Sequence, residues 1–332
     1  MELKICLIGM GNVGKSFLQL IYEKEGIFRT NLNIIFKIVA IFEYDGALIN
    51  NDGINIKALL EDHTNLRSNQ NWNFNLKAID LIPKLDINIL VETTPTNPNF
   101  GEPALSHILQ ALKNHINVIS SNKAPFYLQY NKIKKIAEQN NCSVKFEATV
   151  ASCVPVLSIK KNLAGNTITH IRAILNGTNN YILSRMAAEG ISFSVALKEA
   201  QELGYAETDP ELDINGYDAA GKLVILSNML LNWNKSIEDV NIKGITNITP
   251  HALELAKLDG FVIKHLAIAE EKRLTVEPRL IKRNSPLNIE GTLNIVELQT
   301  KHAGPIILMG RGAGGMEAAS ALLNDLINIA LM

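Results

Sequence analysis

The chain has 332 residues, of which 47% are hydrophobic and 20% are charged, and its formal net charge is −1. This composition suits a globular protein of two domains, or of one large domain with an insertion, with ample apolar surface for a core. The balanced charge excludes the electrostatic footprint of a protein that binds nucleic acid or an anionic membrane. The partner we expect is therefore a small molecule.

The cysteines and the N-terminus indicate the compartment. Cys6, Cys142 and Cys153 are widely spaced, form no CxxC motif, and are odd in number, which argues against a disulfide framework. The N-terminus enters a strand-like run too short for a signal sequence. No apolar run approaches the roughly 18 residues needed to span a bilayer. The sequence predicts a soluble, cytoplasmic protein.

A glycine-rich turn follows the first predicted strand. The apolar run Lys4–Ile8 precedes GMGNVG at Gly9–Gly14, and a helical pattern covers Ser16–Tyr22. In a GxGxxG turn the first glycine permits the tight bend, the second lets the backbone approach a pyrophosphate, and the third lets helix and strand pack closely. Glycines that merely serve a turn are the alternative. The strand–turn–helix context favours a dinucleotide site.

The second predicted strand, Ile34–Phe42, ends at Glu43. A carboxylate at this position can accept hydrogen bonds from both ribose hydroxyls of NAD, and it would repel the 2′-phosphate of NADP. An ordinary strand-end acid is the alternative. No arginine follows nearby in the sequence, so NAD is favoured, with Lys57 as a residue that could support some NADP binding.

Polar segments follow the next two predicted strands. Asn88–Val91 leads into ETTPT, and Asn117–Ile119 leads into SSNKAP, which contains Lys123. Carboxyl ends of parallel strands share one edge of a sheet, where ligands bind. A solvated loop lysine is the alternative for Lys123. With the helical patterns Pro103–Leu112 and Asn131–Gln139 and the strand Ser143–Phe146, the alternation predicts an α/β, Rossmann-type doubly wound parallel sheet over residues 1–147.

After Glu147 the alternation of strands and helices stops, and residues 148–303 read as an α+β domain. A strand at Thr169–Leu175 is followed by Asn176–Asn180, which reads as a turn. The other expected elements are helices at Tyr181–Ala188, Phe193–Leu203 and Tyr217–Leu231 and strands at Phe261–Ala269, Leu274–Ile281 and Leu293–Gln299. Residues 304–332 are expected to form a C-terminal strand, a glycine-rich turn at Gly310–Gly315 and a helix from about Glu317 to Ala330, which return to the nucleotide domain; a flexible C-terminal loop is the alternative.

The stretch Gly204–Lys222, GYAETDPELDINGYDAAGK, concentrates five acids around one lysine. It reads as a loop and turn that enter a helix near Tyr217, where Lys222 lies one turn after Asp218. A solvated acidic loop followed by a surface ion pair is the ordinary interpretation. The nearly continuous apolar run that follows indicates a buried helix, and this favours Lys222 at the wall of a cleft.

Several motifs in order resemble the homoserine dehydrogenase family, and the resemblance covers nearly the whole chain. The matching segments are GMGNVG (9–14), TPTNPNFGEPALSHI (94–108), SNKAP (121–125), FEATV (146–150), ILNGTNNYIL (174–183), GYAETDPELDINGYDAAGK (204–222), SPLNIEGTLN (285–294) and GRGAGGMEAA (310–319). Each segment alone is modest, but their order is highly specific.

The resemblance implies an NAD(P)-dependent interconversion of L-homoserine and L-aspartate 4-semialdehyde, on the branch toward threonine, methionine and isoleucine. Lys222 is similar to the family's proton donor and acceptor, and Lys123 to its second active-site lysine. Glu207 resembles the carboxylate that binds the substrate amine, with Asp213 and Asp218 as companions. We expect Gly177, Thr178 and Tyr205 to hold the substrate carboxylate or the backbone of the site. The expected cofactor-binding residues are Gly9, Gly11, Asn12, Val13, Gly14, Glu43, Thr93, Thr94, Ser121, Lys123 and Gly314.

Family members also bind a monovalent cation, often sodium, through backbone carbonyls. The matching positions are Glu147, Val150, Ser152 and Val154, but Ser152-Cys153 stands where typical members have glycines. If those positions require positive φ, both residues would be strained. The resemblance further implies a homodimer formed through the second domain, and the chain ends too soon for the C-terminal ACT domain of many bacterial members.

Two other classes of protein remain as alternatives. One is a different NAD(P)-dependent dehydrogenase, of the aspartate or saccharopine type, against which the Gly204–Lys222 stretch argues. The other is a nucleotide-binding regulator without catalytic activity, against which the presence of both Lys123 and Lys222 argues. Fold alone decides neither case.

Overall fold

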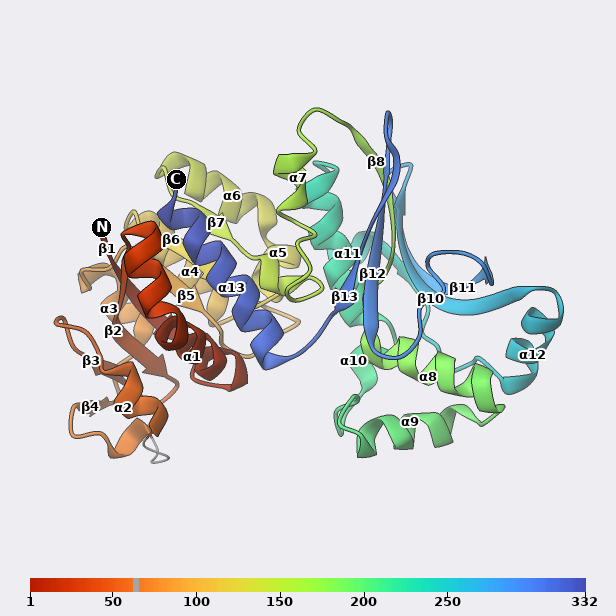
Figure 1. Cartoon of the computed structure of the whole chain (residues 1–332), viewed down its shortest axis with the longest axis horizontal. Helices are drawn as coiled ribbons and strands as arrows, with labels where there is room; N and C mark the ends of the chain where they lie inside the picture. The colour runs from red at the N-terminus through yellow and green to blue at the C-terminus, as the bar shows by residue number, and fades with distance from the viewer. Residues whose placement is uncertain (62–65) are drawn as a thin grey trace. The chain divides into compact units, whose positions relative to one another are not determined.

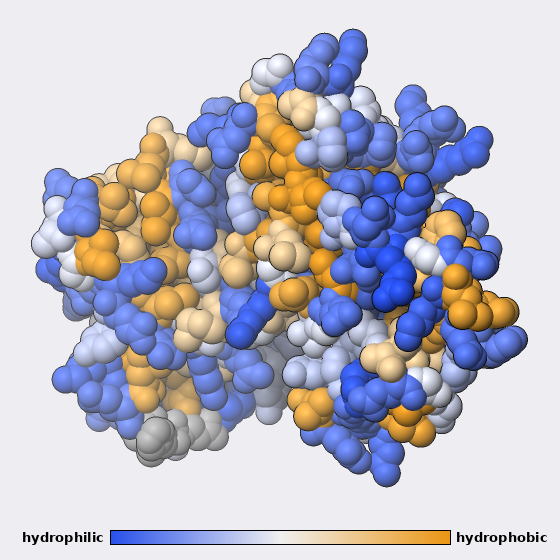
Figure 2. Space-filling view, turned by 45° about the vertical axis from the view of Figure 1, so that its right-hand side comes forward, coloured by the Kyte–Doolittle hydropathy of each residue, from blue (hydrophilic) through white to orange (hydrophobic). Residues whose placement is uncertain are grey.

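The computed structural model describes residues 1–61 and 66–332, which form two compact units. Unit 1 contains Met1–Cys153 and Gly314–Met332, and unit 2 contains Val154–Ala313 (Figure 1). Hydrophilic side chains cover much of the face seen in Figure 2, with apolar groups among them. Within the described ranges, no helix has the length and apolarity that crossing a bilayer requires.

Unit 1 is built on a sheet of strand order β4-β3-β2-β1-β5-β6-β7. The pairs β2–β1, β1–β5, β5–β6 and β6–β7 are parallel, as the alternation of strands and helices predicts. The strands are β1 (Glu2–Ile8), β2 (Ile35–Glu43), β3 (Gly46–Ile49), β4 (Trp72–Phe74), β5 (Ile89–Glu92), β6 (Asn117–Ser120) and β7 (Val144–Lys145). The Rossmann-type fold expected for this part of the chain is confirmed.

Helices connect and cover these strands. They are α1 (Asn12–Ile27), α2 (Ile56–Glu61), α3 (Ala78–Leu81), α4 (Ala104–Lys113), α5 (Ala124–Leu128), α6 (Tyr130–Gln139) and α13 (Gly315–Ala330), with shorter turns η1 (Phe28–Leu32), η2 (Leu66–Ser68), η3 (Ile82–Lys84) and η4 (Glu147–Thr149). Figure 1 shows α13 beside α1, and one buried cluster unites both helices with β1 through Ile5, Leu7, Phe17, Leu322 and Leu326. The C-terminal helix therefore completes the core of unit 1.

An antiparallel extension of this sheet was not foreseen. β3 pairs antiparallel with β2, and β4 pairs antiparallel with β3. Both strands are short, and polar residues separate them from α2, so their apolar periodicity is weak in the sequence. The hairpin begins directly after Glu43, at Tyr44 and Asp45, and Arg67, which precedes β4, bonds Asp45 at the end of β2.

Unit 2 contains a mixed sheet of order β13-β12-β8-β10-β11-β9, antiparallel except for β11–β9. Its elements are α7 (Ile159–Asn162), β8 (Ile168–Ile174), α8 (Gly177–Glu189), α9 (Phe193–Glu202), α10 (Glu211–Ile214), α11 (Tyr217–Leu230), η5 (Ile237–Asp239), β9 (Val240–Ile242), α12 (Pro250–Leu258), β10 (Phe261–Glu270), β11 (Arg273–Lys282), β12 (Leu293–Thr300) and β13 (Gly304–Arg311). An α+β organisation agrees with the sequence prediction.

The segment 304–332 was expected to return to the nucleotide domain as a whole, but the structure divides it between the two units. β13 pairs along its whole length with β12 and stays in unit 2, whereas the helix from Gly315 belongs to unit 1. The strand's alternating burial fits an edge position in the unit 2 sheet. Only the helix therefore joins the dinucleotide fold.

The prediction of a turn at Asn176–Asn180 is wrong. Helix α8 begins at Gly177, and the side chain of Asn176 caps it by accepting the backbone N–H of Asn179. Asparagine and threonine favour caps and turns for the same reason, because their side chains bond nearby backbone groups. Helix α12 was also missed, although Thr249 as N-cap and Pro250 in its first turn are typical start signals.

Candidate active site

The glycine turn between β1 and α1 is closely packed where its motif requires glycine. Gly9 has φ +96°, and a Cβ there would lie 2.9 Å from the carbonyl carbon of Thr93. A Cβ on Gly14 would lie 2.2 Å from the Gly9 oxygen. At Gly11, by contrast, no described heavy atom beyond its chain neighbours and its own helix backbone lies within 4 Å of such a Cβ, and Gly11 is exposed at the start of α1. The first and third glycines thus serve packing, and the second leaves open the backbone beside Asn12 and Val13.

The ends of β1, β5 and β6 form one edge of the sheet. Ile8 pairs with Glu92, and Glu92 pairs with Ser120. Glu92 is fully buried and holds the segment beyond β5, since its side chain accepts from the Thr94 N–H at 2.8 Å and its backbone oxygen accepts from the Ser121 N–H at 3.1 Å. Glu92 was not predicted as a site residue, although an acid at the end of an apolar strand is a sequence signal that could have revealed it.

The other predicted residues of unit 1 lie at or beside this edge. Thr93 donates its hydroxyl to the oxygens of Ile8 and Gly9, at 3.0 and 2.7 Å. Asn122 donates to the Thr94 and Pro95 oxygens, and Lys123, half-buried, is the N-terminal flank of α5. The structure therefore gathers the glycine turn and the two polar segments, as their positions at strand ends predict.

A second helix begins beside the glycine turn. Gly314 has φ +135° and precedes α13, and a Cβ on Gly315 would lie 3.2 Å from the Asn12 oxygen and 3.3 Å from Ser16 Oγ. The N-termini of α1 and α13 are therefore neighbours within unit 1. Backbone N–H groups at helix N-termini attract anions, so both ends favour a bound phosphate group.

Glu43 lies at the end of β2 as predicted, and its carboxylate accepts the backbone N–H of Met10 in the glycine turn. No arginine follows Glu43 closely in the sequence, but the fold brings Arg67 to Asp45, two residues after Glu43. Arg67 forms a two-bond ion pair with Asp45, with Nη2 to Oδ1 at 2.9 Å, and its guanidinium lies 5.3 Å from the Tyr44 ring centroid. The hairpin of β3 and β4 brings it there. Lys57 instead pairs with Glu61 on α2 at 3.7 Å.

In unit 2, Lys222 lies on α11 and is 8% exposed. Its Nζ donates to Asp218 Oδ2 at 2.7 Å and to the Leu175 oxygen at 2.8 Å. The Asp218 side chain is itself 14% exposed, so the pair is not a surface ion pair, and the ordinary interpretation of this stretch fails at this point. Burial with two fixed acceptors defines the direction of the ammonium group.

The acids upstream of Lys222 differ in exposure. Glu207 is exposed, and its backbone oxygen accepts from Gln201 at 3.1 Å. Asp213 lies on α10 and is half-buried; its Oδ2 accepts the Thr178 hydroxyl at 3.1 Å. Burial, and next the charge of Asp218, raise the pKa of Asp213, whereas hydrogen bonds from Asn176 and Thr178 and the charge of Lys222 lower it. Asp213 and Asp218 therefore form a coupled pair beside one ammonium group.

The remaining predicted substrate residues lie around this pair. Thr178 is buried and also donates to the Tyr205 oxygen at 2.8 Å. Tyr205 is 47% exposed and packs on Tyr181, with ring centroids 4.9 Å apart. Gly177 approaches the backbone of Thr292, whose oxygen would lie 2.7 Å from a Cβ. The start of α8 thus supports the acidic segment.

A buried histidine lies behind this segment. His265 on β10 contacts Asn179 Nδ2 through Nδ1 at 3.0 Å and the Lys243 oxygen through Nε2 at 3.0 Å. The Lys243 carbonyl can only accept, so Nε2 carries the proton and Nδ1 accepts. Asn179 Nδ2 also donates to the backbone oxygen of Asp213 at 2.7 Å. Neutral His265 therefore anchors the backbone of Asp213 through Asn179.

We expect this arrangement to be acid-sensitive. Burial lowers the pKa of His265 to about 4 from its ordinary 6.5, although the hydrogen bond to the Lys243 oxygen opposes this. The unfolded chain then binds the proton first, so stability is lost as pH falls from 6.5 to about 4, by about 3 kcal/mol at most. Between pH 6.5 and about 4, the Tm of His265→Gln should therefore fall less steeply with pH than the Tm of the wild type. His251 is exposed, so the Tm of His251→Gln should keep the wild-type dependence on pH. Equal dependence of Tm on pH in the two variants would contradict the assignment.

The turn proposed for a cation, residues 147–154, crosses from one unit to the next. Glu147, Val150 and Ser152 belong to unit 1, and Val154 begins unit 2. Positive φ occurs at Ala151 (+55°) and Ser152 (+49°), so the expected strain falls on these two residues and not on Cys153. Within the described residues, no cluster of three or more His, Cys, Asp or Glu side chains suits a metal ion. A site built from backbone carbonyls needs no such cluster.

Asp325 anchors the same turn from α13. Its Oδ2 accepts the Glu147 N–H at 2.9 Å, and both side chains are buried. Burial raises the pKa of Asp325 to about 7, and the hydrogen bond from Glu147 opposes that rise. An acid in the apolar stripe of a helix is the sequence signal that could have revealed this contact.

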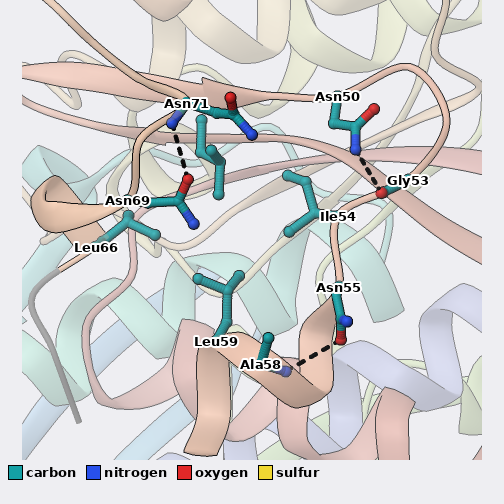
Figure 3. Close-up of a pocket in the computed structure, with 10 residues that line it drawn as sticks. Asn50, Gly53, Ile54, Asn55, Ala58, Leu59, Leu66, Asn69 and Asn71 are labelled. Atoms are coloured by element: carbon teal, nitrogen blue, oxygen red, sulfur yellow. Dashed lines mark hydrogen bonds between the residues drawn. The ribbon is translucent and has the colours of Figure 1, made fainter. Parts of the chain in front are cut away.

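A pocket elsewhere in unit 1 is lined by asparagine and aliphatic side chains (Figure 3). Asn50 donates to the Gly53 oxygen at 2.9 Å, Asn55 accepts from the Ala58 N–H, and Asn69 accepts from the Asn71 N–H. These amides shape local turns, and the Ile54 N–H bonds Ile38 in the middle of β2. The pocket therefore lies away from the strand ends that carry the predicted site.

Together, the glycine turn on a parallel sheet and the buried lysine with its acids define the class of NAD(P)-dependent oxidoreductases. Family models agree: one described as "Homoserine dehydrogenase, NAD binding domain" matches residues 9–147, and one described as "Homoserine dehydrogenase" matches residues 155–327. The chain belongs to the homoserine dehydrogenase family, as its motifs indicate.

Relatives support this membership over the whole chain. A homoserine dehydrogenase from Methanocaldococcus jannaschii is 42% identical, with 98% of each chain covered. An NAD(+)-dependent homoserine dehydrogenase from Pseudomonas canavaninivorans is 35% identical over 99% of this chain and 96% of its own. A solved structure of a hyperthermophilic archaeal homoserine dehydrogenase mutant in complex with NADPH matches with a TM-score of 0.87 at 27% identity, and the match covers 100% of this chain and 98% of that structure's chain.

Proposed function

We propose that this chain interconverts L-homoserine and L-aspartate 4-semialdehyde with a nicotinamide cofactor, on the route to threonine, methionine and isoleucine. The observation that carries the proposal is Lys222, a buried ammonium group held by Asp218 and the Leu175 oxygen at the end of an acidic segment. Unit 1 is assigned the cofactor and unit 2 the substrate. The glycine turn and the adjoining N-termini of α1 and α13 suit a pyrophosphate.

The residues of the chain then have distinct roles. The nicotinamide ring supplies the hydride in one direction and accepts it in the other. An ammonium group has three donors, and the third donor of Lys222 is assigned to the substrate oxygen. Lys222 gives that oxygen a proton during reduction and takes it back during oxidation. Lys123 is assigned electrostatic stabilisation of the alkoxide.

The substrate's amino-acid end is assigned to exposed and half-buried groups of the acidic segment. Glu207 is exposed and suits a charge-assisted hydrogen bond with the substrate ammonium. Asp218 orients Lys222, because it accepts from the ammonium group and from Asn176. Asp213 is held beside this pair by the hydrogen bonds that it accepts from Asn176 and Thr178. Gly177 and Tyr205 are assigned to the backbone around this segment, since Gly177 packs against Thr292 and the Tyr205 oxygen accepts from Thr178.

An assay of the purified protein tests the reaction. We expect homoserine-dependent reduction of NAD or NADP, followed by absorbance, and no reduction with aspartate or saccharopine in its place. Turnover with either of those substrates but not with homoserine would favour the related dehydrogenases. Dinucleotide binding without any turnover would favour a regulator.

NAD is the preferred cofactor in our proposal, because the Glu43 carboxylate at the end of β2 would repel a 2′-phosphate. Arg67 could bind that phosphate only by weakening its two bonds to Asp45. We expect kcat/KM to be about tenfold higher with NADH than with NADPH. Glu43→Gln should narrow this ratio, and Glu23→Gln, an exposed acid on α1, should leave it unchanged. A wild-type preference for NADPH would contradict the assignment.

A monovalent cation, sodium by family resemblance, is assigned to the backbone carbonyls of Glu147, Val150, Ser152 and Val154. Two features support a site that needs backbone geometry rather than side chains. Ala151 and Ser152 adopt the left-handed region, and Asp325 fixes the start of the turn. Activity measured in sodium, in potassium and in a bulky tetraalkylammonium salt decides the assignment, because only the first two ions fit a carbonyl cage.

A cytoplasmic homodimer is the remaining part of the proposal. Cys6, Cys142 and Cys153 are free thiols, which suits a reducing compartment. Apolar side chains remain accessible on the sheet of unit 2, with Ile307 39% and Met309 56% exposed on β13. Burial of such groups stabilises association. Light scattering coupled to size-exclusion chromatography gives the molar mass of the protein in solution, and the mass of a monomer would contradict the assignment.

A further inference from the structure

Asn176 connects the active-site acids to the start of helix α8. Its Oδ1 accepts the Asn179 N–H at 2.9 Å, and its Nδ2 donates to Asp213 Oδ1 at 2.7 Å and Asp218 Oδ2 at 3.0 Å. The side chain is buried. A backbone N–H can only donate, so the amide oxygen must face the helix and the amide nitrogen must face the carboxylates. The orientation of the amide is therefore determined.

The same contacts fix the surroundings of Lys222. Asp218 Oδ2, which accepts from Asn176, is also the oxygen that accepts from Lys222 Nζ. The second acceptor of Lys222 is the oxygen of Leu175, the residue before Asn176. Both acceptors thus depend on the chain at 175–176. A shift of this short segment would redirect the ammonium group.

Charge gives the amide a further role. The titratable groups that face it are Asp213 from α10 and Asp218 and Lys222 from α11. Two carboxylates in a partly buried site repel each other, and each needs donors to remain ionised. Asn176 supplies one N–H to each acid without adding charge. A lysine in its place would compete with Lys222, and a carboxylate would add a third negative charge.

We propose that Asn176 is a positioning residue for Lys222: it holds Asp218 against the ammonium group and keeps Asp213 beside it, while it caps α8. This role rests on the proposed function of Lys222 as the proton donor and acceptor. Asn176 itself does not contact the reacting atoms.

Asn176→Asp separates the capping of α8 from the hydrogen bonds to Asp213 and Asp218. Aspartate caps a helix as well as asparagine, so the start of α8 should persist. The two donors are lost, and the added negative charge favours the ammonium form of Lys222. During homoserine oxidation Lys222 must accept a proton, so we expect the rising limb of kcat/KM against pH to move upward by about one unit. At neutral pH kcat should fall about tenfold or more.

Asn176→Ser is the companion variant. Serine retains a capping oxygen, but it cannot reach the carboxylates with two donors. We expect kcat to fall about tenfold with little change in the KM for the cofactor, and without the displacement of the pH profile that an added charge causes. Thr249→Asp is the matched control, because Thr249 caps α12 in the same unit by accepting the Ala252 N–H at 3.1 Å. Its kcat and pH profile should equal those of the wild type.

The outcomes are distinguishable. Wild-type turnover and an unchanged pH profile in both Asn176 variants would reduce Asn176 to a helix cap and overturn the positioning role. Absence of homoserine turnover in the wild-type enzyme, or full turnover in Lys222→Ala, would instead overturn the proposed function. If Asn176→Asp does not fold, as judged by its Tm, the kcat of Asn176→Ser decides.

Discussion

Replacing Lys222 by alanine should lower kcat for homoserine oxidation by about 10²-fold or more, the usual contribution of a positioned acid or base. The buried ammonium group has two fixed acceptors, Asp218 and the Leu175 oxygen, and alanine supplies no donor in its place. Binding of NADH, followed by fluorescence titration, should stay near the wild-type value, because the dinucleotide site belongs to unit 1. We therefore expect a variant with a much lower kcat and an unchanged affinity for NADH.

Lys160→Ala is the control for loss of a lysine in unit 2. The Lys160 ammonium donates to the Met229 oxygen and to Asn232 Oδ1 at 2.7 Å, at the other end of the helix that carries Lys222. Its removal should lower Tm, since the last carbonyls of α11 lose a donor. Its kcat should remain at the wild-type value. Wild-type turnover in Lys222→Ala would remove that residue from the catalytic role.

Local patterns carried much of the fold in the sequence. Glycines 9, 11 and 14 stand between an apolar β-former run and a helical period, and each requirement is satisfied within about twenty residues of chain. The buried helix that carries Lys222 was equally visible, because the run after Lys222 is nearly all apolar. Such features depend on neighbours in the chain, and for this reason they can be predicted without the tertiary structure.

Contacts between distant parts of the chain could not be predicted in this way. Arg67 reaches Asp45 only because a short hairpin folds back beside β2. Asn176 was read as part of a turn, and its link to two acids 37 and 42 residues away depends on how α8, α10 and α11 pack. These distances are set by the packing of whole elements, and a propensity pattern contains no information about them.

Gly11→Ala should weaken cofactor binding while the protein stays folded. The backbone of Gly11, at φ −72°, suits alanine, and beyond its chain neighbours and its own helix backbone no described heavy atom lies within 4 Å of the added methyl group. The loss of a favourable N-cap residue and the gain in chain entropy offset each other to within about 1 kcal/mol. In a GxGxxG turn the second glycine is the point of closest approach to the pyrophosphate. The methyl group should therefore raise the Kd for NADH by at least about tenfold.

Two further glycine variants show whether a change in Kd comes from lost cofactor contact or from lost stability. Gly14→Ala places a methyl group 2.2 Å from the Gly9 oxygen, so it should lower the free energy of unfolding by about 1–3 kcal/mol in addition to weakening NADH binding. Gly26→Ala, on the same helix, meets no atom within 4 Å and should leave Kd unchanged while it stabilises α1 slightly. Wild-type affinity in Gly11→Ala would mean that the cofactor does not pass over this turn, because neither the backbone angle of Gly11 nor its contacts with the described residues require glycine there.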